Sequence, residues 1–466
     1  MNMTTASAAA VRFLMLISIT LFASLANADY AEDLLERESG YIVDCSYTKW
    51  ARNKETHNWK ADAYGCFNNV RLADDAGPDW VVSSENAVAV IGLMKATRLL
   101  QNDGHDVEAA DAVIKEFFEN WLKWKRQPIV SDGEDAGGVA ERVYYDKQGK
   151  RTKLGDANAG STGIMMVAMY KRYEFLRNTN REKEANDWLA NEDAWRIMNE
   201  GFSFIKKNYN SDHKMVRSRA GQNDLWLTDA TLCACGIKCF EQWAAKSDRS
   251  SEDAESMFNN LREGITAMKD PGDWKNFYRY RQADKDFAPG YGDRVDQICF
   301  LPFESGLLSV EDDFAAAMSD WWTNGSKDSP KMTFQTDDPK NWRYYGTRWK
   351  HFFEGNPETN HYLYPGPSLQ LAKMEWRTGK ASGNESISQR ANHRYAFANN
   401  KSYSNLWFGA SGESEAGVPN GIVDWRDAKD ANRTAAKHER FIDTSSYMIQ
   451  VTLMVFFDRD TSYLPN

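Results

Sequence analysis

The chain has 466 residues and a formal net charge of −10 at pH 7, from 57 basic and 67 acidic side chains. No block of Lys and Arg stands out, which argues against nucleic acids and anionic membranes as partners. A chain of this length can bury a large core, and the lack of a Pro- or Ser-rich linker favours one domain over two.

The first 28 residues have the pattern of a secretory signal peptide. Arg12 is the only charge before an apolar run from Phe13 to Leu25, and the small-residue sequence Ala26-Asn27-Ala28 follows. The run is short for a membrane span, although an uncleaved anchor is the alternative. We therefore expect cleavage after Ala28, a single mature domain over 29–466, and a secreted or periplasmic protein.

Residues 29–80 form a polar, aromatic lead-in with little periodicity. Cys45 and Cys66 flank part of it, and six cysteines in all suit an exported chain, so we predict a local disulfide between these two. The other four are Cys233, Cys235, Cys239 and Cys299, for which buried thiols or one bridge to Cys299 are the alternatives. No His lies close to these cysteines in sequence, so we expect no metal site.

From about residue 83 onward, helix-length segments alternate with loops rich in Gly, Asp, Asn and aromatic residues. Apolar residues recur at three- and four-residue steps, which is typical of amphipathic helices, and a short strand is expected near 143–145. The predicted helices cover roughly 83–100, 106–127, 161–176, 182–207, 224–245, 252–268, 294–309, 311–323, 341–354, 366–377, 386–398 and 436–457.

The helices come in pairs of different character. The outer member of each pair is clearly amphipathic, whereas the inner member is apolar on all sides, as expected for a helix buried within a double ring. An even-numbered series of this kind predicts an all-α fold in which helical hairpins close into a toroid. The loops at one end of the toroid would then form a cleft of carbohydrate size.

Several short motifs lie where inner helices are expected to start. They are the segment Trp80–Leu93 (WVVSSENAVAVIGL), Asp156-Ala-Asn158, Thr228-Asp229-Ala230 and Asp296-Gln297. Together with the helix count, they resemble the six-hairpin glycosidase superfamily, whose fold is the (α/α)6 toroid. Inverting endoglucanases of glycoside hydrolase family eight have a similar early Glu, but the Gly-Gln-x-Tyr that usually follows it is missing here. The resemblance therefore indicates the superfamily and no single family.

The resemblance implies hydrolysis of a poly- or oligosaccharide by paired carboxyl groups. One group must protonate the leaving oxygen, and a second must activate water or attack carbon. We expect Glu85 to be the general acid and Asp229 or Asp296 the base. The helix dipole favours the ionised form of such first-turn acids, whereas burial beside Trp raises a pKa. The alternative for each residue is a structural helix cap.

Sugar binding needs aromatic faces for stacking and polar groups for hydroxyls. The candidates for these roles lie in or beside loops and are Trp80, Asp156, Trp226, Arg294, Trp349 and His361. The sequence has no His-Glu-x-x-His, no Gly-x-Ser-x-Gly and no P-loop, and no dinucleotide fingerprint follows a predicted strand, so no cofactor is expected.

Two other functions remain open at this stage. The first is a polysaccharide lyase or sugar epimerase on the same fold, for which His361, Tyr362 and Arg348 supply suitable side chains. The second is a non-catalytic glycan-binding or cell-envelope protein that keeps the toroid without an acid pair, because fold alone does not determine function. A carbohydrate partner is expected in every case, and the sequence leaves the sugar, the linkage and the oligomeric state undetermined.

Overall fold

The computed structural model describes most of the chain and is predominantly helical, which confirms the predicted fold class. The described residues are 29–47, 62–68, 80–123, 128–269, 280–282, 300–311, 313–324, 333–334, 346–347, 362–363, 365–398, 423–424 and 442–465.

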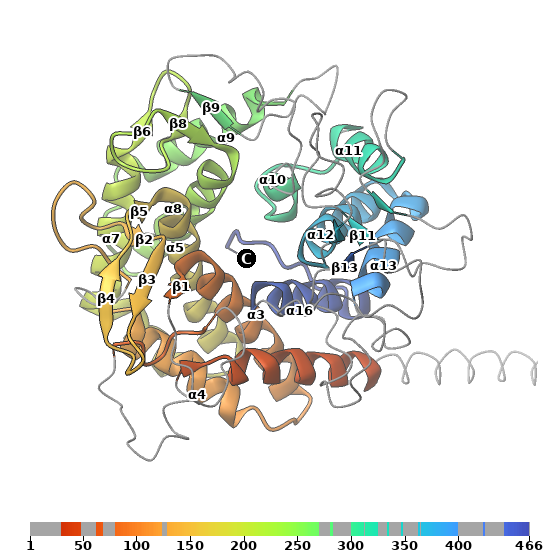
Figure 1. Ribbon diagram of the computed structural model, residues 1–466, viewed down its shortest axis with the longest axis horizontal. Coiled ribbons are helices and arrows are strands. Elements are labelled where there is room, and N and C mark those ends of the chain that lie inside the picture. The colour runs from red at the N-terminus through yellow and green to blue at the C-terminus, as the bar shows by residue number, and fades with distance from the viewer. Residues whose placement is uncertain are drawn as a thin grey trace, which may run out of the picture.

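An inner ring of helices forms the centre of the molecule (Figure 1). Within the described residues, each member contacts the next and the last returns to the first, so the ring is closed. In order, the members are α3 (Ser83–Asn102), α5 (Ala159–Asn178), α8 (Leu227–Lys246), α10 (Leu301–Glu304), α12 (Pro365–Ser382) and α16 (Ile442–Phe457). Helix α5 buries nearly its whole length on every side, as the uniformly apolar sequence predicted.

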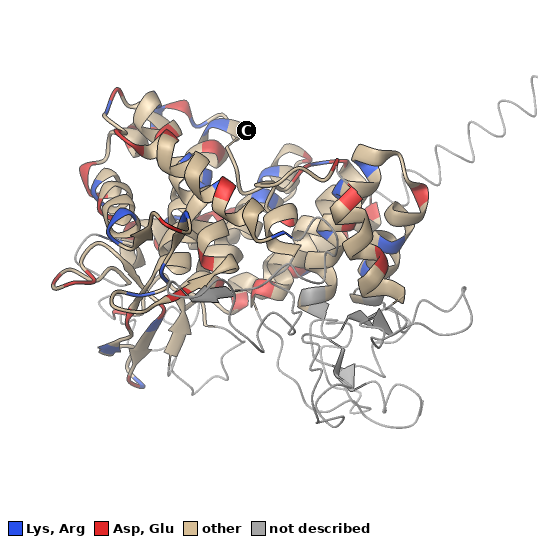
Figure 2. Ribbon diagram, turned by 90° about the horizontal axis from the view of Figure 1, so that it is seen from above, with Lys and Arg blue, Asp and Glu red and all other residues tan. Residues whose placement is uncertain are grey.

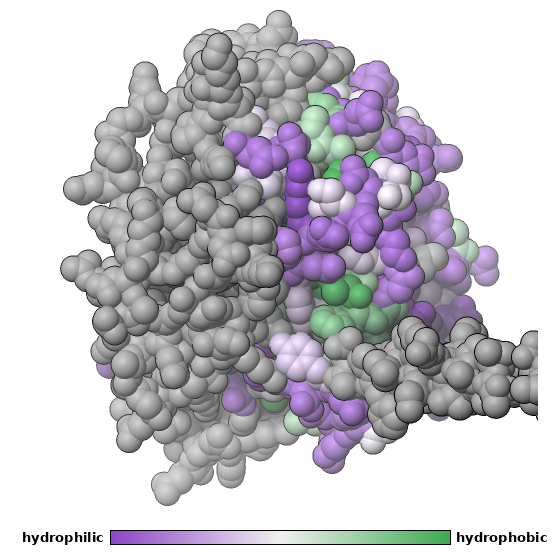
Figure 3. All heavy atoms as spheres, turned by 90° about the vertical axis from the view of Figure 1, so that its right-hand side faces the viewer, coloured by the Kyte–Doolittle hydropathy of each residue, from purple (hydrophilic) through white to green (hydrophobic). Residues whose placement is uncertain are grey.

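An outer layer of amphipathic helices surrounds this ring. Its helices cover residues 29–44, α4 (Glu108–Glu116) with the π-helix η1 (Phe117–Trp121), α6 (Glu182–Ala190), α7 (Glu192–Lys207), α9 (Ala254–Ala267), α11 (Asp313–Asn324) and α13 (Glu385–Ala398). The described surface on the α13 side is mostly hydrophilic (Figure 3), and basic and acidic residues are interspersed along the described helices (Figure 2). Alternating outer and inner helices form the hairpins of an (α/α)6 toroid.

The inner helices α5 and α8 run parallel and in very close contact. A Cβ on Gly160 would collide with the Asp229 side chain, and a Cβ on Gly163 would collide with the backbone of Leu232. Both contacts advance three residues along each helix, so the two helices point the same way. Their N-termini therefore lie at the same end of the ring.

Short antiparallel strands precede the inner helices. β1 (Trp80–Val82), β3 (Arg142–Tyr145) and β4 (Arg151–Leu154) form one sheet in the order β1-β3-β4, and β3 covers the short strand predicted from sequence. The other pairs are β2 (Val139–Ala140) with β5 (Ala157–Asn158), β6 (Tyr209–Asn210) with β7 (Met215–Val216), β8 (Asp224–Trp226) with β9 (Tyr280–Gln282), β10 (Thr333–Phe334) with β11 (Gly346–Thr347), and β12 (Tyr362–Leu363) with β13 (Val423–Asp424).

Backbone hydrogen bonds join the starts of three inner helices. Ser83 N donates to Glu141 O at 3.0 Å, and Glu141 N donates to Asp156 O at 2.9 Å. Farther along, Ala159 N donates to Ser218 O at 2.9 Å, and Ser218 N donates to Asp224 O at 3.3 Å. These bonds place β1, β5 and β8, and the helices that follow them, around one end of the ring, which we call the strand rim.

Three local predictions were wrong. The lead-in begins with a helix over 29–44, because Ala31, Leu34, Leu35 and Ile42 bury one face of it. The predicted helix 182–207 is two helices, since Asn191 ends α6 and caps α7 by accepting from Ala194 N at 2.9 Å. Gly346–Thr347, inside the predicted helix 341–354, is strand β11, and the rest of that segment lies outside the described residues.

The predicted disulfide between Cys45 and Cys66 is not formed, and both residues are buried cysteines outside any disulfide. Ser46 pairs with Phe67 in an antiparallel bridge, so Cys45 faces Asn68 and Cys66 faces Tyr47. The two thiols are therefore diagonal neighbours, which are farther apart than the Cβ separation of a disulfide allows. Cys233, Cys235 and Cys239 are also free and buried, in agreement with one of the two alternatives.

The N-terminal 28 residues and Cys299 lie outside the described part of the chain. Among the helices that are described, none combines the length and the apolar character that crossing a bilayer requires.

Candidate functional site

Glu85 lies in the first turn of α3, directly after β1. The strand-to-helix junction is fixed by Asn86, which is buried, accepts from Phe67 N at 2.7 Å and donates to Val82 O at 3.0 Å. Glu85 itself is partly buried, and its Oε2 is shielded from solvent with no hydrogen-bond partner among the described residues. An unpartnered carboxyl oxygen of this kind is costly unless the group is protonated or binds a ligand.

Asp443 lies in the first turn of α16, the neighbour of α3 across the closing point of the ring. Ser446 Oγ donates to Val88 O at 2.5 Å, and Ser446 fills the space beside Gly92, where a Cβ would collide with it. Glu85 precedes Val88 by three residues, and Asp443 precedes Ser446 by three. The two carboxyl groups therefore occupy equivalent places at the N-terminal ends of adjacent helices.

The two carboxyl groups have different electrostatic environments. Burial, and next the negative charge of Asp443, raise the pKa of Glu85 to about 8, although Arg142 opposes this shift. Burial raises the pKa of Asp443 to about 6, and the hydrogen bond that it accepts from Thr444 N at 2.7 Å opposes the shift. Near neutral pH, Glu85 is the better proton donor and Asp443 the better proton acceptor.

Sequence reasoning missed Asp443, although the same kind of signal marks it. Like Glu85, it is an acid at the start of an apolar helix, in the run Phe441-Ile-Asp-Thr-Ser-Ser. The predicted helix began near 436, which placed Asp443 in its second turn rather than at its start. In the structure the described helix begins at Ile442, so Asp443 lies in its first turn, at the N-terminal end.

Trp80 opens β1 and is the one large apolar side chain among the described residues that is well exposed, at 39%. The guanidinium of Arg142 lies 4.8 Å from the centre of its ring, and Val82, two residues along the same strand, pairs with Arg142. When an arginine covers one face of an exposed indole, the other face is left for stacking. Trp80 is therefore well placed for the sugar-binding role predicted for it.

Asp229 is in the first turn of α8, 9% exposed, and wedged against Gly160 at the start of α5. Burial raises its pKa to about 6, and the hydrogen bond from Asn158 Nδ2 at 3.4 Å opposes the shift. Asn158 also caps α5 by accepting from Ser161 N at 2.7 Å. Asp229 thus joins two helix starts at the strand rim, and its predicted role as a base remains a prediction.

Asp156 and Trp226 also lie at the strand rim. Asp156 precedes β5, is 70% exposed and pairs with Arg219 at 3.2 Å, while Arg219 also binds Glu141. A cavity of about 360 Å³ lies beside them and is lined by Val130, Asp132, Glu134, Asp135, Asp156, Arg219, Ala220 and Gln222. Trp226 ends β8 immediately before α8. The structure therefore brings Trp80, Asp156 and Trp226 to one rim.

Four of the predicted site residues lie outside the described part of the chain. They are Asp296, Arg294, Trp349 and His361. Their predicted roles in catalysis and sugar binding remain predictions.

A buried polar network lies one to two turns deeper in the ring than Asp443. Gln370 Nε2 donates to Tyr447 OH at 3.0 Å and to Glu304 Oε1 at 3.1 Å. Lys373 lies 3.7 Å from Glu304 and donates to Gln450 at 2.8 Å. Burial raises the pKa of Glu304 to about 7, whereas the Lys373 charge opposes that shift. The network joins α10, α12 and α16 beneath the acid pair.

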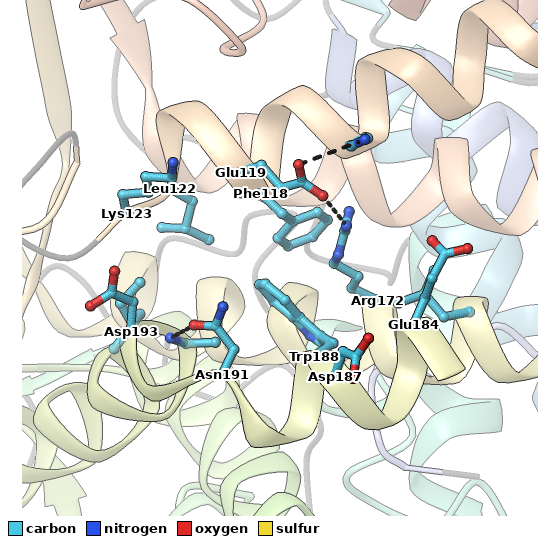
Figure 4. Close-up of a pocket in the computed structure, with 14 residues that line it drawn as sticks. Phe118, Glu119, Leu122, Lys123, Arg172, Glu184, Asp187, Trp188, Asn191 and Asp193 are labelled. Carbon is cyan, nitrogen blue, oxygen red and sulfur yellow. Dashed lines mark hydrogen bonds and ion pairs between the residues drawn. The ribbon is translucent and has the colours of Figure 1, made fainter. Parts of the chain in front are cut away.

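Another cavity, of about 530 Å³, lies on the outer wall between α4–η1 and α6–α7 (Figure 4). The guanidinium of Arg172 lies on its floor between the rings of Phe118 and Trp188, at 5.0 and 4.9 Å, and binds Glu119 at 3.2 Å. Its acids come from outer helices and are Glu119, Glu184, Asp187 and Asp193. This cavity is separate from the N-terminal ends of the inner helices that carry Glu85 and Asp443.

Groups of side chains that could bind a metal are absent from the described part of the chain. No three or more His, Cys, Asp or Glu side chains are arranged there to hold a metal ion.

Comparison with known proteins identifies the fold. No model of a known protein family matches the chain, and the comparison with curated proteins found no match. The structure is similar to that of a D-mannose isomerase, with a TM-score of 0.57 and 10% identity over 92% of this chain and 98% of that one. It is similar to a cellobiose 2-epimerase from Bacillus thermoamylovorans B4167, with a TM-score of 0.57 and 9% identity over 91% and 98% of the two chains.

A third similar structure is a family 76 glycoside hydrolase from a bovine Bacteroides thetaiotaomicron strain. Its TM-score is 0.51, with 10% identity over 92% of this chain and 78% of that one. The fold is thus the (α/α)6 toroid, and the resemblance predicted from sequence is confirmed for the fold.

Proposed function

We propose that this protein is a glycoside hydrolase that cleaves a poly- or oligosaccharide at the strand rim. The observation that carries the proposal is the pair Glu85 and Asp443, two partly buried carboxyl groups at equivalent places on adjacent inner helices. Glycosidic cleavage requires two carboxyl groups in different protonation states, and these two environments provide them. The exposed face of Trp80 on the same rim suits a sugar ring.

In this proposal Glu85 protonates the leaving glycosidic oxygen. Asp443, which accepts a hydrogen bond from the backbone N–H of Thr444 and is ionised above about pH 6, removes a proton from the attacking water. Asp229 and Asp296 remain the alternative bases indicated by the sequence, and variants distinguish them from Asp443. We favour inversion of the anomeric carbon, as in the endoglucanases that the early Glu resembles. NMR of the first-formed product anomer tests this preference.

A sugar epimerase or isomerase on the same fold is the second candidate. It is favoured because two of the similar structures are a D-mannose isomerase and a cellobiose 2-epimerase. Such a reaction moves a proton beside a carbonyl carbon and needs a base with a pKa near neutral. Glu304 has such a pKa, although it is fully buried.

The deciding experiment is turnover on a panel of glycans, with new reducing ends and epimerised sugars measured in the same samples. Wild type should release reducing ends, and Glu85→Gln and Asp443→Asn should each abolish that release. Glu255→Gln is the matched control, because Glu255 is also a first-turn acid but lies exposed on the outer helix α9. Epimerised sugar without cleavage would favour the second candidate. Saturable glycan binding without any turnover would favour a binding protein.

Export belongs to the same proposal. Residues 1–28 would direct secretion or periplasmic transfer, and the mature chain would begin at Asp29. N-terminal sequencing of protein recovered outside the cytoplasm tests this, and a retained leader would contradict it.

A further inference from the structure

A third cavity lies at the end of the inner ring opposite the strand rim. Its volume is about 460 Å³, and it is formed by the C-terminal turns of α3 and α5 and by residues 458–461 after α16. In the view of Figure 1, the chain beyond α16 ends at the centre of the ring. Four cations line the cavity, namely Lys95 and Arg98 from α3, Lys171 from α5 and Arg459 from the C-terminal segment.

The four cations differ in how far they are paired. Arg98 and Arg459 form no side-chain hydrogen bond or ion pair with any part of the chain that the structure describes. Lys95 Nζ reaches one backbone oxygen, Ser462 O, at 3.5 Å. Lys171 differs, because it donates to Glu174 Oε2 and to Leu464 O, both at 2.7 Å.

Each carboxylate around the cavity is already paired with a cation. Asp460 pairs with Arg377 at 2.5 Å, Asp458 pairs with Lys380, and Glu174 pairs with Lys171. Positive charge is therefore left over at this place, although the chain as a whole carries −10. This excess is not explained by the composition.

The cations without carboxylate partners are also close enough to repel one another. Burial first, and then the charge of Arg459, lower the pKa of Arg98. Burial, and then the charges of Lys171 and Lys373, lower the pKa of Lys95. Cations at helix C-termini do interact favourably with the helix dipole, but that effect does not require two guanidinium groups to share one cavity.

We infer that this cavity binds an anion that carries a phosphate or sulfate group, held by Arg98, Arg459 and Lys95. Guanidinium groups bind such groups through paired N–H donors, and an ammonium adds a point charge. The anion would replace the repulsion among these side chains by attraction. The site lies at the opposite end of the inner helices from Glu85, so it does not depend on the proposed glycosidase activity.

Thermal melts of the full chain in sodium phosphate or sodium sulfate, against sodium chloride at equal ionic strength, test the inference. The melting temperature of wild type should rise saturably with phosphate or sulfate, because a ligand that binds the folded state stabilises it. The double variant Arg98→Gln with Arg459→Gln should lose this rise. Arg262→Gln is the matched control, an exposed arginine on α9, and should keep it.

Calorimetric titration with inorganic phosphate supplies a second measurement on a milder variant. Arg459 is exposed, so Arg459→Gln should fold and should weaken phosphate binding about tenfold or more, the effect expected for loss of one charge-assisted contact. Titration with glucose 6-phosphate and with glucose distinguishes a free anion from one carried on a sugar. A linear salt effect without saturation, or equal binding by wild type and Arg459→Gln, would overturn the inference.

Discussion

Glu85 and Asp443 lie at the same level of two parallel neighbouring helices, although 358 positions separate their contact residues Val88 and Ser446 in sequence. The first and last inner helices of the ring bring them together, so the site exists only when the toroid is closed. Two partly buried carboxyl groups so placed disfavour double ionisation, and their raised pKa values of about 8 and about 6 favour one shared proton near neutral pH.

The first prediction concerns turnover by variants of this pair. Glu85→Gln and Asp443→Asn should each lower kcat by roughly 10² to 10⁴-fold, because each removes one partner in proton transfer. KM should change little, since both replacements keep the shape of the side chain. The double variant should be scarcely worse than either single one, because the two groups act as a unit. Additive losses would instead indicate independent roles.

The second prediction concerns pH. Activity needs Asp443 ionised and Glu85 protonated, so it should fall as pH drops through about 6 and again as pH rises through about 8. Arg142 opposes the raised pKa of Glu85, and Arg142→Gln should therefore move the alkaline limb to higher pH. Initial rates from about pH 4 to about pH 10 measure both limbs. An alkaline limb that stays in place in Arg142→Gln would remove Glu85 as its source.

The third prediction concerns stability and Asp229. The pKa of Asp229 is 3.8 in the unfolded chain and about 6 in the folded chain, so the folded state favours the protonated carboxyl. The stability that this protonation contributes is lost as pH rises through about 6. Asp229→Asn cannot ionise. Its free energy of unfolding should exceed that of wild type by on the order of 2 kcal/mol at about pH 8. Below about pH 4 the two free energies should be equal.

Urea denaturation at the two pH values measures this difference. Turnover of the same variant decides the role of Asp229, because a large loss of kcat would make it the base in place of Asp443. If Asp229→Asn is less stable than wild type at the higher pH, the hydrogen bond from Asn158 stabilises the ionised Asp229 by more than burial of its charge destabilises it.

Long segments with a helical pattern, apolar on all sides or amphipathic, made the helices of both layers predictable from sequence. The predicted helix 161–176 lies within α5, and the helix predicted over 252–268 covers α9. The failures occurred where local pattern competes with context. In the helix over 29–44, Gly40 and a charged Glu-Arg-Glu-Ser run hide an apolar face that is short but regular. At Asn191, one capping residue divides a pattern that is periodic on both sides.

Only one member of the candidate acid pair was predictable from sequence, and the reason differs from that for the helices. Glu85, Asp229 and Trp80 could be proposed from sequence because each stands at or just before a helix start that the sequence marks clearly. The partnership of Glu85 with Asp443 depends on the contact of the last helix with the first, through Ser446 and Gly92, and no local pattern encodes that contact. The disulfide prediction failed likewise, because spacing along the chain does not show that Cys45 faces Asn68.

The fourth prediction concerns the contact between α5 and α8. A methyl group at Gly163 would collide with the backbone at Leu232 and Cys233, which cannot move aside as a flexible side chain can. Gly163→Ala should therefore lower the free energy of unfolding by roughly 1–3 kcal/mol, despite the higher helix propensity of Ala. It should also separate the helix starts that hold Asn158 and Asp229, and so lower activity if Asp229 takes part.

Gly40→Ala is the control for this substitution. Gly40 lies in the helix over 29–44, and a methyl group added there would meet no other atom within 4 Å, so Ala should be neutral or stabilise by about 0.5–1 kcal/mol. Chemical denaturation of both variants beside wild type gives the comparison. If Gly163→Ala proved as stable as Gly40→Ala, the two inner helices would have to lie farther apart than their glycines indicate. The close parallel contact that brings Asp229 to the strand rim would then be wrong.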